Sequence, residues 1–166
     1  MRIHVLTAAV MVVGGIVLAS AALEAQSDGA GARHAPAQGG GADGHTAIAP
    51  DALKWTPVGP STLLAVLDGS PEKEGAPFVI RLKLASGTRV PPHWHPVDEH
   101  LTIISGTFYM GTGEKFDEST ATALTIGSYA MMPKEVRHFG WTGVETVVQI
   151  HGVGPFKTYF VEQPAK

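Results

Sequence analysis

Short runs in which apolar and polar residues alternate fill the chain from residue 51 to its end. Such alternation has the period of a half-buried β-strand, and clusters of Gly, Pro, Asp and Ser separate the runs. Strands spaced roughly 8–12 residues apart are typical of an antiparallel sandwich or barrel rather than of a parallel α/β sheet. The pattern predicts an all-β fold with strands at Thr62–Leu67, Phe78–Ala85, Glu99–Ile104, Thr107–Met110, Ala121–Ile126, Tyr129–Met132, Val136–Trp141, Glu145–His151 and Phe156–Val161, and a turn of helix or a loop at Glu114–Thr120.

The first 25 residues show no such alternation. Arg2 precedes a mostly apolar stretch, Val5–Ala19, and small residues follow it. This order of charged, apolar and small zones is typical of a secretory signal peptide. We therefore predict that residues 1–25 are cleaved and that the mature protein is periplasmic or secreted, without stable membrane association. An uncleaved anchor is the alternative, because Val5–Leu23 approaches the roughly 20 residues that span a bilayer, although two adjacent glycines weaken that interpretation.

Residues 26–50 consist largely of small residues, with six Gly, seven Ala, two Pro and no aromatic side chain. Such a segment cannot bury enough surface to offset the loss of chain entropy. We therefore predict a flexible linker here, followed by the folded domain at residues 51–166. His34 and His45 lie in the linker, where a solvated role is expected and metal capture is a minor alternative.

Composition narrows the classes of function. Twelve Lys and Arg against 15 Asp and Glu give a net charge of −3, and no run of basic residues occurs, so nucleic acid and anionic membranes are not expected partners. The absence of cysteine excludes disulfides, thiolate metal sites and thiol redox chemistry. Eight histidines remain as candidate chemistry.

His93, His95 and Glu99 form the most informative cluster. Residues two apart on a strand project to the same face, so the imidazoles of His93 and His95 can reach one ion, and flanking prolines favour an extended backbone. Glu99 opens an alternating run in a phase that places it on the apolar face, where a carboxylate is costly unless it is paired or bound to metal. A surface pair of histidines and a half-solvated Glu99 at a strand end are the alternatives.

The spacing of these residues extends the cluster into two motifs. Their fixed positions are Gly87, His93, His95, Glu99 and Gly106 in the first motif, and Gly127, Pro133 and His138 in the second. At these positions the sequence resembles the cupin superfamily, whose motifs are G-x5-H-x-H-x3/4-E-x6-G and G-x5-P-x-G-x2-H-x3-N. The first motif matches throughout, whereas Glu135 and Thr142 replace the second glycine and the asparagine of the second motif.

The resemblance implies a cupin-type jelly-roll β-barrel with one metal ion held by His93, His95, Glu99 and His138. Three neutral imidazoles and one carboxylate suit Fe, Mn, Ni, Cu or Zn rather than Ca or Mg. Because Glu135 lacks the conformational freedom of glycine, we expect the turn after Pro133 to be of another type or slightly strained. Small cupins often pair, so a homodimer is a further expectation.

Three further polar residues on the predicted strands bear on the extent of the site. His100 follows Glu99 directly, so alternation turns it away from the metal. Gln149 and His151 share one face of the run Glu145–His151 and are candidates for orienting groups in the pocket. The slightly favoured alternative has both facing solvent while the apolar residues of that run face the core.

The leading functional hypothesis is an exported, single-domain cupin that binds one divalent transition metal ion (Fe, Mn, Ni or Zn) and coordinates a small oxygenated or anionic molecule. If it is an enzyme, an oxidoreductase of the dioxygenase type is expected, with no separate nucleophile. The alternatives are a non-enzymatic module that binds a metal or small ligand in the cell envelope, and a barrel with an empty site. The empty barrel is disfavoured because all four ligand positions are intact.

Overall fold

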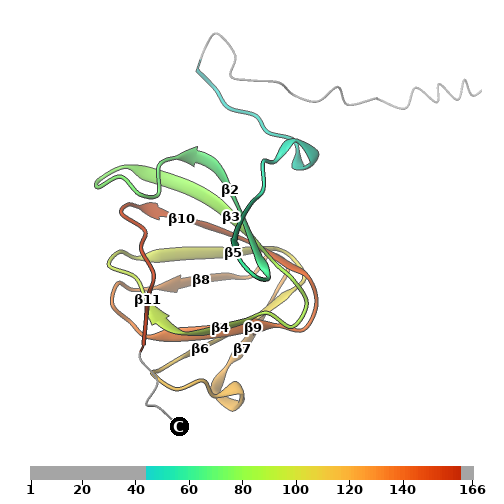
Figure 1. Cartoon of the computed structure of the whole chain (residues 1–166), viewed down its shortest axis with the longest axis vertical. Coiled ribbons are helices and arrows are strands. Elements are labelled where there is room, and N and C mark those ends of the chain that lie inside the picture. The colour runs from blue at the N-terminus through green and yellow to red at the C-terminus, as the bar shows by residue number, and fades with distance from the viewer. Residues whose placement is uncertain (1–43, 162–166) are drawn as a thin grey trace, which may run out of the picture. The chain divides into compact units, whose positions relative to one another are not determined.

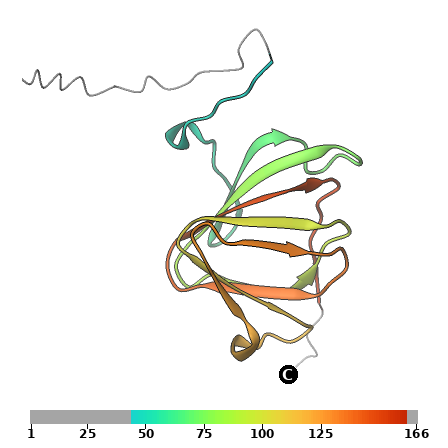
Figure 2. The same ribbon diagram turned by 180° about the vertical axis from the view of Figure 1, so that it is seen from behind.

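Two antiparallel sheets, packed face to face, make up the part of the chain that the computed structural model describes, residues 44–161 (Figures 1 and 2). No α-helix occurs in this part, which has two 3-10 turns, η1 (Pro50–Ala52) and η2 (Glu118–Thr120). The predicted all-β fold is confirmed. The predicted signal peptide at residues 1–25 lies outside the described residues, as does most of the predicted linker at residues 26–50.

Each sheet takes strands from distant parts of the chain. The first sheet has the order β1 (Thr56–Gly59), β2 (Thr62–Gly69), β3 (Pro77–Leu84), β10 (Thr146–Val153), β5 (Glu99–Ser105) and β8 (Tyr129–Met132). The second has the order β11 (Tyr159–Phe160), β4 (Arg89–Trp94), β9 (His138–Thr142), β6 (Thr107–Thr112) and β7 (Thr122–Thr125). Consecutive strands such as β4 and β5 therefore lie in different sheets, and the short loop between them crosses the sandwich.

The core fills the space between the sheets because the strands bury alternate residues. On β10, Val148 and Ile150 are buried whereas His151 is exposed. Removing such apolar faces from water is the main stabilising contribution to a sandwich of this kind. The buried apolar cluster comprises Phe78, Ile80, Leu84, Leu101, Ile103, Phe108, Met110, Met132, Val148 and Ile150.

Two strands were absent from the predicted set, β1 and β4. All four residues of β1 are exposed at the edge of the first sheet, so no alternation marks it. β4 contains Pro91 and Pro92, which have no backbone N–H to donate, and its register with β9 shifts between Val90 and His93. The irregularity turns the second half of β4 into a bulged strand that carries His93.

Gly106 forms the corner where the chain passes from β5 in the first sheet to β6 in the second. Its φ of 76° lies in the left-handed region that favours glycine. A side chain is also excluded by space, because a Cβ at this position would lie 2.5 Å from the carbonyl oxygen of Glu145. This glycine therefore fixes the sheet-to-sheet crossing that follows the strand beginning with Glu99.

The described residues begin outside the sandwich, with no helix or strand at residues 44–49. Thr46 and Ile48 line a shallow groove together with Leu67 and Val79 of the first sheet. Nowhere in residues 44–161 is there a helix with the length and apolar character needed to cross a membrane.

Candidate metal centre

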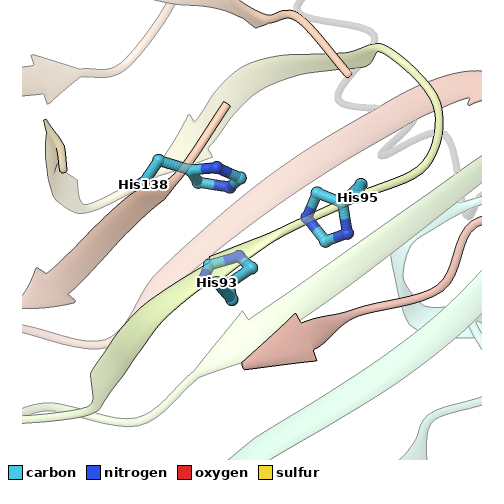
Figure 3. Close-up of side chains that lie close together, drawn as sticks. All are labelled: His93, His95 and His138. Carbon is cyan, nitrogen blue, oxygen red and sulfur yellow. The ribbon is translucent and has the colours of Figure 1, made fainter. Parts of the chain in front are cut away.

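Three histidines from the second sheet and its adjoining loop gather inside the sandwich (Figure 3). His93 on β4 and His138 at the start of β9 are partners in the strand register, and their ring centroids lie 4.1 Å apart. His95 follows the last residue of β4 and brings its ring to 5.2 Å from that of His138. One ring nitrogen of each histidine lies within 4.8 Å of the others, which is close enough to share an ion.

Glu99 approaches the same point from the opposite sheet, as the first residue of β5. Its Oε2 atom lies 3.3 Å from Nε2 of His138 and 3.9 Å from Nε2 of His95. The side chain is buried, with a residue exposure of 5%. The structure thus brings together all four residues that the cupin motifs single out, and the half-solvated alternative for Glu99 is wrong.

The backbone fixes which nitrogen of each imidazole faces the cluster. Nδ1 lies 2.7 Å from the carbonyl oxygen of Pro91 in His93, 2.8 Å from that of Lys157 in His95, and 2.9 Å from that of Val136 in His138. A carbonyl can only accept, so each Nδ1 carries the proton and donates it. Each Nε2 is then left with a free lone pair, which is the form that binds a metal ion.

Two of these nitrogens, and one oxygen of Glu99, meet no hydrogen-bond donor. Nε2 of His95, Nε2 of His138 and Oε2 of Glu99 are buried and have no hydrogen-bond partner. Buried polar atoms are rarely left unpaired, because an unmet group costs about 1–3 kcal/mol. Three acceptors pointed at one another repel unless a cation lies between them. The donor set therefore fits a transition metal ion.

Burial favours the neutral form of two of the imidazoles. Burial, together with the nearby His138, lowers the pKa of His93 from 6.5 to about 4. Burial also lowers the pKa of His95. For Glu99 burial acts to raise the pKa, but the contacts with His138 and His95 outweigh it and hold the pKa below its ordinary value. Burial therefore favours neutral nitrogens on His93 and His95, beside an ionised oxygen of Glu99.

Two hydrogen bonds clamp the loop after β4 to the turn before β9. The backbone N–H of Glu135 donates to the carbonyl oxygen of His95 at 2.8 Å, and the N–H of Lys134 donates to Oδ1 of Asp98 at the same distance. Glu135 has φ 64°, so it keeps the left-handed conformation of the motif glycine that it replaces. The turn is therefore of the glycine type and strained, the second of the two outcomes expected for it.

Gln149 and His151 do not reach the cluster, so their interpretation as pocket residues is corrected. They lie on the outer face of β10, because Val148 and Ile150 occupy the inner one. Oε1 of Gln149 accepts a hydrogen bond from Arg81 at 3.1 Å. His151 stacks on His100 at 5.0 Å.

His100 lies on the outer face of β5, as alternation requires, next to the inward-facing Glu99. Its Nδ1 atom lies 2.7 Å from the hydroxyl oxygen of Tyr129 on the neighbouring strand β8. The outer face thus gives this histidine a polar partner and no access to the metal site.

A cavity of about 560 Å³ leads from the cluster to the surface. His93, His95 and Glu99 line its inner end. Most of its wall is aliphatic or aromatic, and the chain after β10 contributes Phe156 and Phe160 as it runs along one side of the sandwich to β11 (Figure 1). The site can therefore receive a small molecule, which fits the volume range usual for ligand pockets.

Sequence reasoning missed several groups that hold the site together. The three carbonyl acceptors leave no trace in the sequence, because every residue has a carbonyl. The sequence pattern places Phe156 in an ordinary strand, and nothing in it indicates that the ring stacks on His95 at 4.3 Å. Asp98 was not considered, although a side chain that can accept a backbone N–H commonly stabilises a loop of this kind.

An antiparallel two-sheet sandwich that gathers histidines in its interior defines the chain as a cupin. More particularly, it belongs to the family described as the ChrR cupin-like domain, whose model matches residues 43–157. The resemblance to cupins drawn from the two motifs is confirmed. Among curated proteins, none matches the sequence.

Solved structures with the same fold share little sequence with this chain. The polyketide cyclase RemF from Streptomyces resistomycificus is 13% identical with a TM-score of 0.59, over 72% of this chain and 87% of that chain. An RmlC-like cupin from Shewanella frigidimarina is 14% identical with a TM-score of 0.54, over 66% and 89%. Salicylate 1,2-dioxygenase from Pseudoaminobacter salicylatoxidans, in adducts with gentisate, is 13% identical with a TM-score of 0.53, over 64% and 31%.

Proposed function

We propose that this cupin binds one divalent transition metal ion through Nε2 of His93, His95 and His138 and a carboxylate oxygen of Glu99. The observation that carries the proposal is the convergence of buried acceptor atoms without a hydrogen-bond partner, on side chains from both sheets. A divalent cation at this point would satisfy these acceptor atoms together and balance the charge of the carboxylate.

The chain's own residues prepare this site before any ion arrives. The carbonyls of Pro91, Lys157 and Val136 hold the three imidazoles in one tautomer and one orientation. Glu99 supplies the negative charge that partly balances a divalent ion. The apolar wall of the cavity lowers the polarity around the inner end, which strengthens electrostatic interactions there.

Four protein ligands leave two positions open on a six-coordinate metal such as Fe, Mn or Ni. When bound, such an ion supplies Lewis-acid or redox chemistry at those positions. We therefore propose that the protein coordinates a small oxygen-donor molecule, and that its reaction, if any, is an oxidation of the dioxygenase type. The salicylate 1,2-dioxygenase is a precedent for that chemistry on this fold.

Elemental analysis of the natively purified protein tests the proposal. One equivalent of Fe, Mn, Ni or Zn is expected per chain, falling to near zero in His138→Ala. The matched control is His100→Ala, on the outer face, which should keep the full equivalent. Equal metal content in all three proteins would refute the site. Oxygen uptake with a panel of phenols and small carboxylates then separates an enzyme from a module that binds ligands without turnover.

We further propose that the protein is exported and acts in the periplasm or outside the cell. The order of charged, apolar and small residues in residues 1–25 supports this. N-terminal sequencing of the native protein is expected to find a start at Gln26, or at Ala22 or Leu23 if cleavage follows Ala21 or Ala22. A protein that still begins at Met1 and fractionates with membranes would support an uncleaved anchor instead.

A further inference from the structure

The cavity has walls that are far more apolar than its inner end, the floor formed by His93, His95 and Glu99. Aliphatic side chains from the first sheet form one side, among them Leu64, Leu82 and Ile150. Phe156 and Phe160, from the chain after β10, add aromatic rings to the wall. The polar side chain of Thr88 at the margin is already engaged, because its hydroxyl donates to the carbonyl oxygen of Ala85 at 2.7 Å.

Two large apolar side chains remain exposed at the mouth. Val58 on the edge strand β1 is 55% exposed, and Phe160 on β11 is 60% exposed. Both line the cavity, from opposite lips. Exposed apolar groups that rim a cavity mark a surface that an apolar ligand covers, because contact with the ligand removes them from water.

The charges around the cavity leave no partner for a second anionic group. Among the described residues that line it, Arg89 is the one arginine and there is no lysine. Nη1 of Arg89 is bound to Oε1 of Glu118 at 2.6 Å, and its guanidinium stacks over Phe116 at 3.9 Å. The remaining acidic group of the wall, Glu72, is itself negative.

The charge balance at the inner end of the cavity limits the charge that a ligand can carry. A divalent ion carries two positive charges and Glu99 one negative charge, so one positive charge is left for the ligand to neutralise. A ligand with one anionic or neutral oxygen head satisfies the metal. Any further charge on its body would be buried against leucine, isoleucine and phenylalanine without a counter-ion, which is costly.

We infer that the ligand of this site is an amphipathic molecule with a single oxygen-donor head, which binds the metal, and an uncharged apolar body that fills the cavity. Small hydrophilic polyanions and phosphorylated compounds are excluded by the same charge balance. The inference rests on the proposed metal site and adds the chemical class of what that site takes.

Calorimetric titration of the protein loaded with Co²⁺ tests the inference with three carboxylates as probes. Acetate has the head alone, hexanoate adds an apolar tail, and adipate has the same chain with a second carboxylate. Each buried methylene strengthens binding by about fourfold, so hexanoate should bind at least tenfold more tightly than acetate. Adipate should bind at least tenfold more weakly than hexanoate.

A matched pair of surface variants tests whether the apolar tail of hexanoate contacts Phe160. Phe160→Ser should weaken hexanoate by fourfold or more and leave acetate unchanged. Tyr159→Ser is the control, because Tyr159 lies next to it in β11 but stacks on Trp94 at 4.4 Å and does not line the cavity. Both positions are largely exposed, so the fold should tolerate either change.

The outcomes separate the inference from the metal proposal. Hexanoate no tighter than acetate, or adipate as tight as hexanoate, would overturn the inference while Co²⁺ stoichiometry near one leaves the metal site standing. A protein that takes up no Co²⁺ would overturn the metal site and with it the inference.

Discussion

Within the two sheets and their loops, histidines gather in an inner group and in an outer group, which differ in burial and in their hydrogen-bond partners. His93, His95 and His138 are buried, tied by Nδ1 to backbone carbonyls, and face one another. His100 and His151 stack on the outer face of the first sheet, where His100 has the Tyr129 hydroxyl as its partner. The comparison teaches that a metal site is marked by acceptors that are buried and left without a donor, and not by the number of histidines.

The largest effect is expected from removing one inner histidine. His138→Ala deletes a proposed ligand at the point where β4 and β9 meet, so retained metal should fall from about one equivalent to near zero. His100→Ala, on the outer face, should leave metal content unchanged. Elemental analysis after dialysis measures both. If the outer variant loses metal instead, the two groups have been assigned the wrong way round.

Substitution of Glu99 tests whether the buried cluster needs a negative charge to bind metal. Glu99→Gln keeps the shape but leaves three neutral nitrogens, so we expect metal affinity to fall at least 10-fold. Glu99→Ala should weaken binding further, because water replaces the ligand. Competition with a chelator of known affinity gives both values, and circular dichroism checks that the sandwich is folded. Affinity equal to wild type in both variants would remove Glu99 from the site.

Acidification should destabilise the metal-free protein because the buried cluster takes up protons less readily in the folded chain than in the unfolded one. The pKa of His93 is about 4 in the folded protein and 6.5 ordinarily, so between these values the unfolded chain binds a proton that the folded one does not. Stability should therefore fall as pH drops from 6.5 towards 4, and the lowered pKa values of His95 and Glu99 act in the same direction.

Thermal denaturation of metal-free protein across this pH range measures how steeply stability falls with pH. His93→Gln should make this dependence weaker. A slope that His93→Gln leaves as steep as in wild type would assign the pH dependence to groups outside the inner cluster.

The smallest effect concerns the turn that carries His138. Glu135 is the one non-glycine residue with positive φ in residues 44–161, a conformation that costs about 1 kcal/mol or more. Glu135→Gly relieves it, partly offset by the greater entropy of the unfolded chain, so the free energy of unfolding should rise by up to about 1 kcal/mol. Chemical denaturation measures it. Lys134→Gly, one residue earlier and without positive φ, should destabilise instead.

The sequence predicted which side chains converge better than it predicted the strands that carry them. Regular spacing placed His93, His95, Glu99 and His138 together correctly, because the cupin motifs encode the two turns that meet at the site. Periodicity found most strands but not β4, since two prolines interrupt its hydrogen bonding. A motif can thus locate side chains within a strand that alternation alone does not reveal.

Other features follow from partners that no pattern along the chain specifies. The side to which Gln149 and His151 point depends on the phase of β10. The sequence favours the solvent side only slightly, and the packing of Val148 and Ile150 in the core fixes it. The tautomer of His95 depends on a carbonyl 62 positions away. Such long-range contacts come from the fold as a whole.

The four residues of the centre come from both halves of the sandwich: Glu99 begins a strand of the first sheet, and the histidines lie in or beside the second. Under the proposed coordination a bound ion cross-links the sheets, and only the folded chain presents all four ligands at once. Mass action then couples folding to metal supply, adding about 1.4 kcal/mol to the free energy of unfolding for each tenfold rise in free metal above Kd. The fraction of the protein that stays folded would thereby depend on the concentration of free metal ion around it.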